Sequence, residues 1–278
     1  MGNDTVIETQ RFLETQRAFD SVAPDYDGPR GNNRLIQAMR TNLWRVVENV
    51  VPLGSRLLDL GCGTGLDAVY FASKGYRVVA TDWSPKMVER TINRAAENGA
   101  YDRVTTERIG IQELHRLYSG DFDLIYSDLG PLNCVEDLTS VSRECANRLA
   151  PGGKVVFSVI GKWCPWEFIY YVLRGKWSRA IVRFSRKQVP IQMNGHTIWA
   201  NYHSPVSFAA HFSNEFEIEN YRGMSIFVPP PYLIDIFDRL GFVSKALQTV
   251  DRLVCGFPIF RNFGDHFLIT MTKKKSEK

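Results

Sequence analysis

Short apolar runs alternate with amphipathic stretches over much of the chain. Five apolar runs have the length of buried strands, and they cover residues 56–60, 77–81, 104–109, 122–128 and 154–160. Between and before these runs, other stretches place apolar residues at helical spacing, for example over 35–50 and 136–148. Strands that alternate with helices are typical of a parallel sheet covered by helices on both faces. The pattern therefore predicts an α/β fold.

The pattern also divides the chain. A helix is predicted over 4–19, ahead of the strands, and two further strands are predicted over 216–221 and 265–272. A stretch without a strand of this sheet separates the fifth strand from the last two. The four parts that we expect are an N-terminal helical cover at 1–50, a core at 51–160, a lid or substrate insertion at 161–203 and the C-terminal part of the core sheet at 204–278.

A glycine-rich turn follows the first strand. Gly61, Gly63 and Gly65 occupy alternate positions, and an amphipathic run that predicts a helix comes directly after them. Strand, glycine turn and helix form the opening of a nucleotide-binding βαβ unit. Glycine lets the backbone approach a ligand closely, because it has no Cβ. We therefore expect a ligand at this turn.

The charges around the turn indicate which ligand. Asp59 and Asp67 flank the glycines, and carboxylates beside a phosphate would repel it. Leu66 stands where a dinucleotide site has its third glycine, and the Gly-Lys-Ser/Thr signature of a phosphate loop is absent. Asp82 ends the second strand, at the distance where an acid binds ribose hydroxyls. These features favour a ribose-containing ligand that is cationic near the glycines.

Four motifs in this order resemble the class I methyltransferases that use S-adenosylmethionine, a cofactor with a sulfonium and an ammonium group and no phosphate. They are the N-terminal segment 18–27, the glycine loop 59–65, the fourth strand 122–128 and the L-x-P-G-G turn with the fifth strand at 149–157. The resemblance implies a Rossmann-like, mostly parallel sheet of seven strands with helices on both faces. It also implies that the core is the cofactor-binding part of the chain.

The resemblance assigns cofactor contacts to residues on several loops. Asp82 is expected at the ribose, and Tyr26 in the cover over the cofactor. Family members commonly carry an acid at the position of Gly110, so here we expect the backbone of Gly110 and Ile111, with Gln112, to hold the adenine. The full set of expected cofactor residues is Tyr26, Asp59, Gly61, Cys62, Gly63, Thr64, Gly65, Asp82, Trp83, Met87, Gly110, Ile111, Gln112 and Ser127.

One acid is the first candidate for a catalytic base. Asp128 ends the fourth strand, and ligands of open α/β sheets bind beyond the carboxyl ends of the strands. The alternative is that Asp128 only caps a turn. Direct in-line displacement on the sulfonium methyl would need little beyond alignment of donor and acceptor in a dry pocket. The expected acceptor-binding residues are Asn133, Trp163, Trp166, His196 and Tyr202.

The insertion at 161–203 combines aromatic and basic residues. Aromatic and aliphatic side chains repeat at helical spacing over 166–177, among seven Lys and Arg residues between 162 and 187. A hairpin is predicted over 189–202, because Asn194-Gly195 separates two apolar runs. The insertion is interpreted as a structural cap, a substrate lid or a contact for an anionic partner. For the last, a peripheral membrane or lipid contact through 162–187 is favoured over RNA.

Composition narrows the class of protein. The chain has 278 residues, 44% of them hydrophobic, and a net charge of +4, which is too small by itself to indicate nucleic acid. Its five cysteines and five histidines lack disulfide or metal-site spacing, so we expect reduced thiols and no metal. No apolar run reaches the roughly 18 residues of a membrane span, and no signal peptide is recognised. We expect a cytoplasmic protein and leave its oligomeric state open.

Taken together, these features predict a methyltransferase that uses S-adenosylmethionine and acts on a small, apolar or lipid-like acceptor. Two alternatives stay open. An RNA or protein methyltransferase would use the basic insertion and bind RNA in a salt-sensitive way. A non-catalytic module would keep the cofactor fold without turnover.

Overall fold

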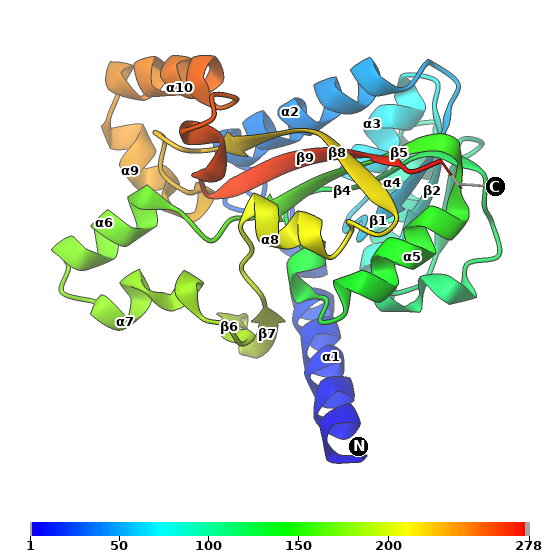
Figure 1. Cartoon of the computed structure of the whole chain (residues 1–278), viewed down its shortest axis with the longest axis horizontal. Coiled ribbons are helices and arrows are strands. Elements are labelled where there is room, and N and C mark those ends of the chain that lie inside the picture. The colour runs from blue at the N-terminus through cyan, green and yellow to red at the C-terminus, as the bar shows by residue number, and fades with distance from the viewer. Residues whose placement is uncertain (1, 276–278) are drawn as a thin grey trace.

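The computed structural model describes the backbone of residues 2–275 and the side chains of residues 10–275. Seven strands form one sheet, in the order β3-β2-β1-β4-β5-β9-β8 (Figure 1). Their bounds are β1 (Arg56–Leu60), β2 (Arg77–Thr81), β3 (Val104–Glu107), β4 (Phe122–Ser127), β5 (Leu149–Ile160), β8 (Phe216–Met224) and β9 (His266–Lys273).

Strand direction follows the connections between the strands. β1 to β5 are parallel to one another, and each is joined to the next by a segment that contains a helix or a helical turn. β9 runs antiparallel to both β5 and β8. The prediction of a seven-stranded, mostly parallel, Rossmann-like sheet is confirmed. The order reverses between β1 and β4, and this crevice beyond the carboxyl ends is where such sheets bind ligands.

Helices bury one apolar core on each face of the sheet. On one face, α2, α3 and α4 pack over Leu57, Leu124 and Val156. On the other face, α5 and α8 pack over Leu58 and Ile125. The bounds of these helices are α2 (Arg34–Val50), α3 (Leu66–Ser73), α4 (Pro85–Glu97), α5 (Leu138–Arg148) and α8 (Pro205–Ala210).

Two elements lie over the carboxyl edge of the sheet. They are α1 (Gly2–Val22) and the hairpin of β6 (Val189–Met193) and β7 (His196–Ala200), which lie beside each other in Figure 1. The Trp199 indole donates to Glu14 at 2.8 Å, which ties the hairpin to α1. The predicted Asn-Gly turn is confirmed, with φ of 49° at Asn194 and 79° at Gly195.

The first half of the insertion forms α6 (Pro165–Leu173) and α7 (Trp177–Ala180) and is fixed to the sheet by one arginine. The buried Arg183 guanidinium pairs with Glu167 and with Asp265, each at 2.6 Å. Burial of so many charges is stable only when they are paired and hydrogen-bonded, as here. The insertion is therefore anchored at its centre.

The structure corrects three expected element bounds. The aromatic run 166–177 is not one helix, because Gly175 adopts a φ of 67° and separates α6 from α7. β5 begins at Leu149 rather than at Lys154, since Leu149 already pairs with Phe122 of β4. The apolar pattern predicts a helix over 232–240, which is found as α9 (Ile234–Arg239), but α10 (Phe242–Val254) follows it and was not predicted.

Candidate active site

A cavity of about 340 Å³ lies beyond the carboxyl ends of β1, β2 and β4, under α1 and the hairpin. It is lined by residues that are far apart in sequence, among them residues of the glycine turn, the ends of β2 and β4, the loop after β3, α1, α2 and the hairpin. This is the size of a small-molecule site and the location expected in this type of sheet.

The glycine turn forms one wall of the cavity. Gly61, Gly63 and Gly65 all adopt positive φ, between 55° and 79°. A Cβ on Gly65 would lie 2.7 Å from the Thr91 side chain of α4, so only glycine lets this helix pack against the turn. The Thr91 hydroxyl donates to the Gly63 carbonyl at 2.9 Å and holds the turn in shape. The expected ligand loop is therefore preformed.

Asp82 lies beside the glycine turn. Its carboxylate accepts hydrogen bonds from the amides of Gly63, at 2.9 Å, and Ser84, at 2.8 Å. Burial raises the pKa of Asp82 to about 6, and the two amides oppose that shift. Each carboxylate oxygen accepts one amide and keeps a lone pair free, which suits a ligand that presents two hydroxyl groups.

Flat apolar side chains line the cavity next to Asp82. The Trp83 ring packs against Phe12 of α1, with centroids 4.3 Å apart, and Ile111 and Gln112 line the same region. A Cβ on Gly110 would lie 2.9 Å from the Trp83 ring, so a larger residue at this position would displace the indole. An adjoining hollow of about 370 Å³ shares Trp83 and Gln112 with the cavity.

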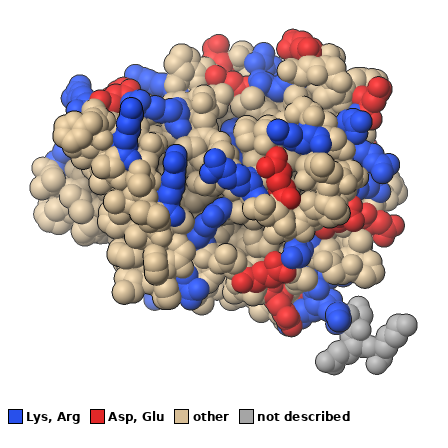
Figure 2. Space-filling view, turned by 90° about the horizontal axis from the view of Figure 1, so that it is seen from above, with Lys and Arg blue, Asp and Glu red and all other residues tan. Residues whose placement is uncertain are grey.

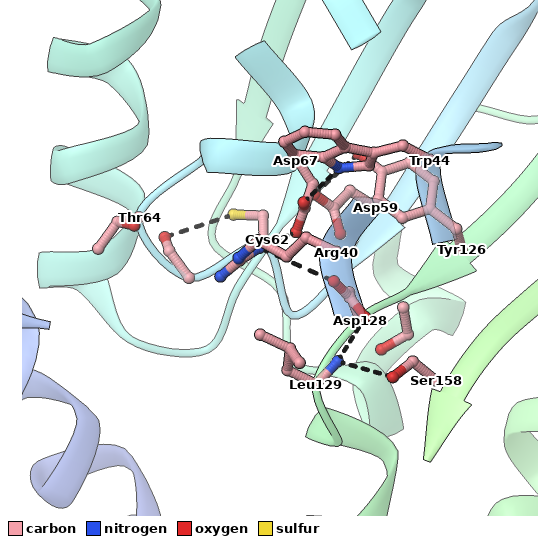
Figure 3. A network of polar contacts seen from close by, with 12 residues as sticks. Arg40, Trp44, Asp59, Cys62, Thr64, Asp67, Tyr126, Asp128, Leu129 and Ser158 are labelled. Carbon is pink, nitrogen blue, oxygen red and sulfur yellow. Dashed lines mark hydrogen bonds and ion pairs between the residues drawn. The ribbon is translucent and has the colours of Figure 1, made fainter. Parts of the chain in front are cut away.

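A buried arginine organises the polar contacts beside the glycine turn (Figure 3). Arg40 of α2 forms an ion pair with Asp67 of α3, and Asp128 lies 3.9 Å from the same nitrogen. The Trp44 indole donates to the second oxygen of Asp67 at 2.7 Å. Behind them, Asp59 accepts the Tyr126 hydroxyl at 3.0 Å.

This network carries more carboxylates than it can neutralise. Burial, with the nearby charge of Asp67, raises the pKa of Asp128 to about 6 and the pKa of Asp59 well above its ordinary value. Burial alone would lower the pKa of Arg40. The negative charges of Asp67 and Asp128 outweigh the effect of burial, so the pKa of Arg40 is raised. Asp67 and Asp128 share one guanidinium and Asp59 lies behind them, so the site favours a ligand with positive charge.

The remaining wall of the cavity is apolar. Ile191, Met193, Ile198 and Ala200 of the hairpin face Phe19 of α1. Among the described residues that line the cavity, Arg40 is the only Lys, Arg or His. The cavity therefore has one charged end, where the glycine turn lies, and one apolar end under the hairpin.

The structure brings eleven of the expected site residues together at this cavity. They are Tyr26, Gly61, Cys62, Gly63, Asp82, Trp83, Met87, Ile111, Gln112, Asp128 and Asn133.

Five further expected cofactor residues lie next to the cavity without lining it. Asp59 is held by Tyr126 behind the wall, and Gly65 packs against α4. The Ser127 hydroxyl is buried and donates to the Leu60 carbonyl at 2.7 Å. The other two are Thr64 and Gly110.

Four expected acceptor-binding residues lie away from the cavity. Trp166 donates to the Phe227 carbonyl at 2.6 Å, and Trp163 packs against Phe184. The Tyr202 ring lies beside the guanidinium of Arg183, 5.2 Å from it, and His196 is exposed at the tip of the hairpin. The two tryptophans and Tyr202 thus pack with the anchored half of the insertion, and other hairpin residues contribute its part of the cavity wall.

The residues that reach the cavity from separate elements were not predicted from the sequence. These are chiefly Arg40, Phe12 and the apolar hairpin side chains. Side chains of the hairpin strands alternate between two faces. Once the turn was recognised, this alternation could have identified the residues that face the cavity, which are Ile191, Met193, Ile198 and Ala200. Arg40 gave no such signal, because it lies on a helix among other polar residues.

Comparisons with known proteins agree with this geometry. The profile of a family described as "Methyltransferase domain" matches residues 57–153. The ubiquinone biosynthesis O-methyltransferase of Xanthomonas axonopodis pv. citri is 30% identical over 166 residues, which are 58% of this chain and 67% of that protein. The demethylmenaquinone methyltransferase of Clavibacter sepedonicus is 34% identical over 141 residues, 50% of this chain and 54% of the relative.

A solved structure shares the fold over nearly the whole chain. It is the N-methyltransferase NodS of Bradyrhizobium japonicum in complex with S-adenosyl-L-homocysteine, with a TM-score of 0.58 and 14% identity. The match covers 95% of this chain and 100% of that one.

We expect the affinity for S-adenosylmethionine to fall as the pH drops through about 6. The pKa of Asp82 is raised to about 6, so above this pH the carboxylate accepts hydrogen bonds, and below it the acid is protonated. Calorimetric titration should show a loss of about tenfold between pH 7 and pH 5 from this group alone.

The variant Asp82→Asn should bind more weakly at pH 7 and show a smaller pH dependence, because its amide does not titrate in this range. Asp102→Asn, which removes an exposed carboxylate, is the matched control. An unchanged pH dependence in Asp82→Asn would reject the role of this carboxylate.

Proposed function

The chain belongs to the class I methyltransferases that use S-adenosylmethionine, and on this premise we propose that it methylates a small, apolar or lipid-like acceptor. The observation that carries the proposal is the two-ended cavity. Its charged end suits a cationic methyl donor, and its apolar end, formed by α1 and the hairpin, suits an apolar molecule.

The donor set fits the cofactor group by group. We infer that Asp82 binds the ribose hydroxyls, and that Trp83, Ile111 and Gln112 bind the adenine. Arg40 is the cation available for the carboxylate of the methionine part, and Asp67 is the acid available for its ammonium. When bound, S-adenosylmethionine supplies an electrophilic methyl group.

The acceptor class follows from the opposite wall. Ile198 and Ala200 are almost completely buried, and neither they nor Ile191 and Met193 offer a charged partner for a polar acceptor. The names of two relatives, given above, place them in ubiquinone and menaquinone chemistry, which is compatible with an apolar, ring-containing acceptor. An RNA or protein acceptor finds less support, because the cavity is roofed by α1 and the hairpin.

We propose that catalysis rests mainly on position and on exclusion of water. The α1 and hairpin residues hold the acceptor against the glycine turn, so that its nucleophilic atom and the methyl group lie in line. Asp128 is the proposed base for an acceptor that must lose a proton, since burial raises its pKa to about 6, close to neutrality. A protonated oxygen acceptor would give up its proton to this carboxylate as the new bond forms.

A label experiment tests the acceptor class. The protein is incubated with methyl-labelled S-adenosylmethionine and an organic extract of its source cells, and the products are partitioned between water and organic solvent. Label should enter the organic phase. Ile198→Asp should abolish this product, because a carboxylate at the apolar wall is costly to bury, with little change in cofactor affinity.

Thr197→Asp is the control, since residue 197 lies on the other face of the same strand. Label that stays in the aqueous phase would reject an apolar acceptor. Equal activity of the two aspartate variants would reject the hairpin as the acceptor wall.

The base is tested by Asp128→Asn. We expect turnover to fall by about 10²–10⁴-fold while the dissociation constant of the cofactor changes only a few fold. Single-turnover kinetics and calorimetry on the same preparation give the two values. Equal losses in rate and affinity would show that Asp128 is a cofactor ligand and not the base.

We also propose that residues 162–187 contact a membrane surface from the cytoplasmic side. Exposed apolar side chains on α6 and α7, Ile169, Leu173 and Trp177, lie among exposed basic residues, which suits an anionic bilayer. In the described part of the chain, no helix is long and apolar enough to cross a membrane.

Sedimentation with vesicles of anionic phospholipid tests this contact. Leu173→Ser combined with Trp177→Ser should reduce the bound fraction several fold, because both side chains are exposed and apolar. Val206→Ser, which removes an exposed apolar side chain on α8, is the control. An unchanged bound fraction in the double variant would reject the contact.

A further inference from the structure

A separate pocket lies on the face of the sheet that α2 covers, between α2, β8 and α10. Its volume is about 310 Å³, and it shares no lining residue with the active-site cavity. Its charged and amide side chains are Asn42, Arg45, Asn49, Arg222, Asp251 and Arg252. Nothing in the methyl-transfer proposal uses this pocket.

Three arginines from three different elements converge here. Arg45 comes from α2, Arg222 from β8 and Arg252 from α10. None of them forms an ion pair with a carboxylate of the described residues, and the only hydrogen bond from their guanidinium groups runs from Arg222 to the Asn42 carbonyl, at 3.4 Å. Figure 2 views this side of the molecule and shows Lys and Arg gathered around a hollow, on the part where α2 and α10 lie.

The single acid in the lining does not neutralise these charges. Asp251 accepts hydrogen bonds from the amides of Ile226, at 3.2 Å, and Phe227, at 2.7 Å, and these bonds hold the loop after β8. Burial raises the pKa of Asp251 to about 6. Near neutral pH the pocket therefore keeps a surplus of positive charge.

Arg222 is the least solvated of the three. It is half-buried in the sheet, and its pKa is lowered by burial and by the neighbouring charge of Arg45. A partly buried guanidinium without an acid partner is unfavourable unless a bound anion balances its charge. A guanidinium also presents paired donors that match the oxygens of a phosphoryl group.

We propose that this pocket binds a phosphoryl group, held by Arg222 at its base and by Arg45 and Arg252 at its rim. Asn42 and Asn49 lie on the same face of α2 as Arg45, at spacings of three and four residues, and add neutral amide donors. The pocket has room for a mono- or diphosphate.

Two sources can supply this group, a free phosphate ester or the headgroup of a lipid. α10 exposes Val250 and Leu253, and Phe257 is exposed just beyond its end, so apolar surface lies on the helix that carries Arg252. A lipid headgroup would place its acyl chains near such a surface. The two sources are separated by the choice of probe.

The experiment is calorimetric titration of the full chain with two probes, sodium pyrophosphate and dihexanoyl phosphatidic acid kept below its micelle concentration. We expect at least one probe to bind, and Arg222→Gln to weaken that binding at least about tenfold. The double variant Arg45→Gln with Arg252→Gln changes only exposed side chains, so it tests the pocket even if Arg222→Gln does not fold. Arg108→Gln is the control. It removes the charge of an exposed arginine that follows β3 and does not line the pocket.

Binding of pyrophosphate alone supports the site and assigns it to a free phosphate ester, whereas tighter binding of the lipid supports it and assigns a headgroup. Arg108→Gln should bind as the unmodified chain does. The proposal is overturned if neither probe binds, or if the double variant binds them as well as Arg108→Gln does. Phosphate-induced thermal stabilisation that persists in the double variant would overturn it as well.

Discussion

The site depends on one buried guanidinium that faces two carboxylates. Arg40 belongs to the N-terminal cover, Asp67 to the helix after the glycine turn, and Asp128 to the end of β4. Their pairing fixes α2 against the nucleotide-binding unit, because a buried ion pair that loses one partner leaves an uncompensated charge. Since the acids outnumber the arginine, the same interaction leaves the cavity poised for a cationic ligand. Fold and ligand preference therefore share one electrostatic origin.

Much of the fold could be predicted from the sequence because its signals are local. The glycine turn, the apolar strands and the Asn194-Gly195 turn each need only a few neighbouring residues to be recognised. The exceptions have physical reasons. α10 carries several of its apolar residues, among them Phe242 and Leu253, on its exposed side, so its pattern does not report contact with the core. The aromatic run from 166 to 177 has helical spacing, but Gly175 breaks it.

The candidate site was predictable only in part, and the predictable residues are again those whose roles depend on neighbouring residues in the chain. Asp82 and the glycines were identified because their roles depend on the chain next to them. Arg40 and Ile198 were not, since their place at the cavity depends on how α2 and the hairpin pack. Trp166 shows the converse: an aromatic residue close to a binding segment in sequence instead donates to the Phe227 carbonyl and holds the insertion in place.

The two halves of the insertion have different roles. The first half is fixed to the sheet, and the hairpin in the second half lines the cavity. Arg183 binds the carbonyls of Gly161 and Asp265 and pairs with Glu167, so α6 and α7 cannot move freely against the sheet. The hairpin that follows makes its own contacts with α1, through Trp199 and Glu14. An acceptor that enters the cavity must therefore pass between α1, the hairpin and the sheet. α1 is also tied to the end of β2, since Asp20 accepts the Ser84 hydroxyl and Gln16 donates to the Trp83 carbonyl at 3.4 Å, so the cover over the cavity is continuous with the sheet.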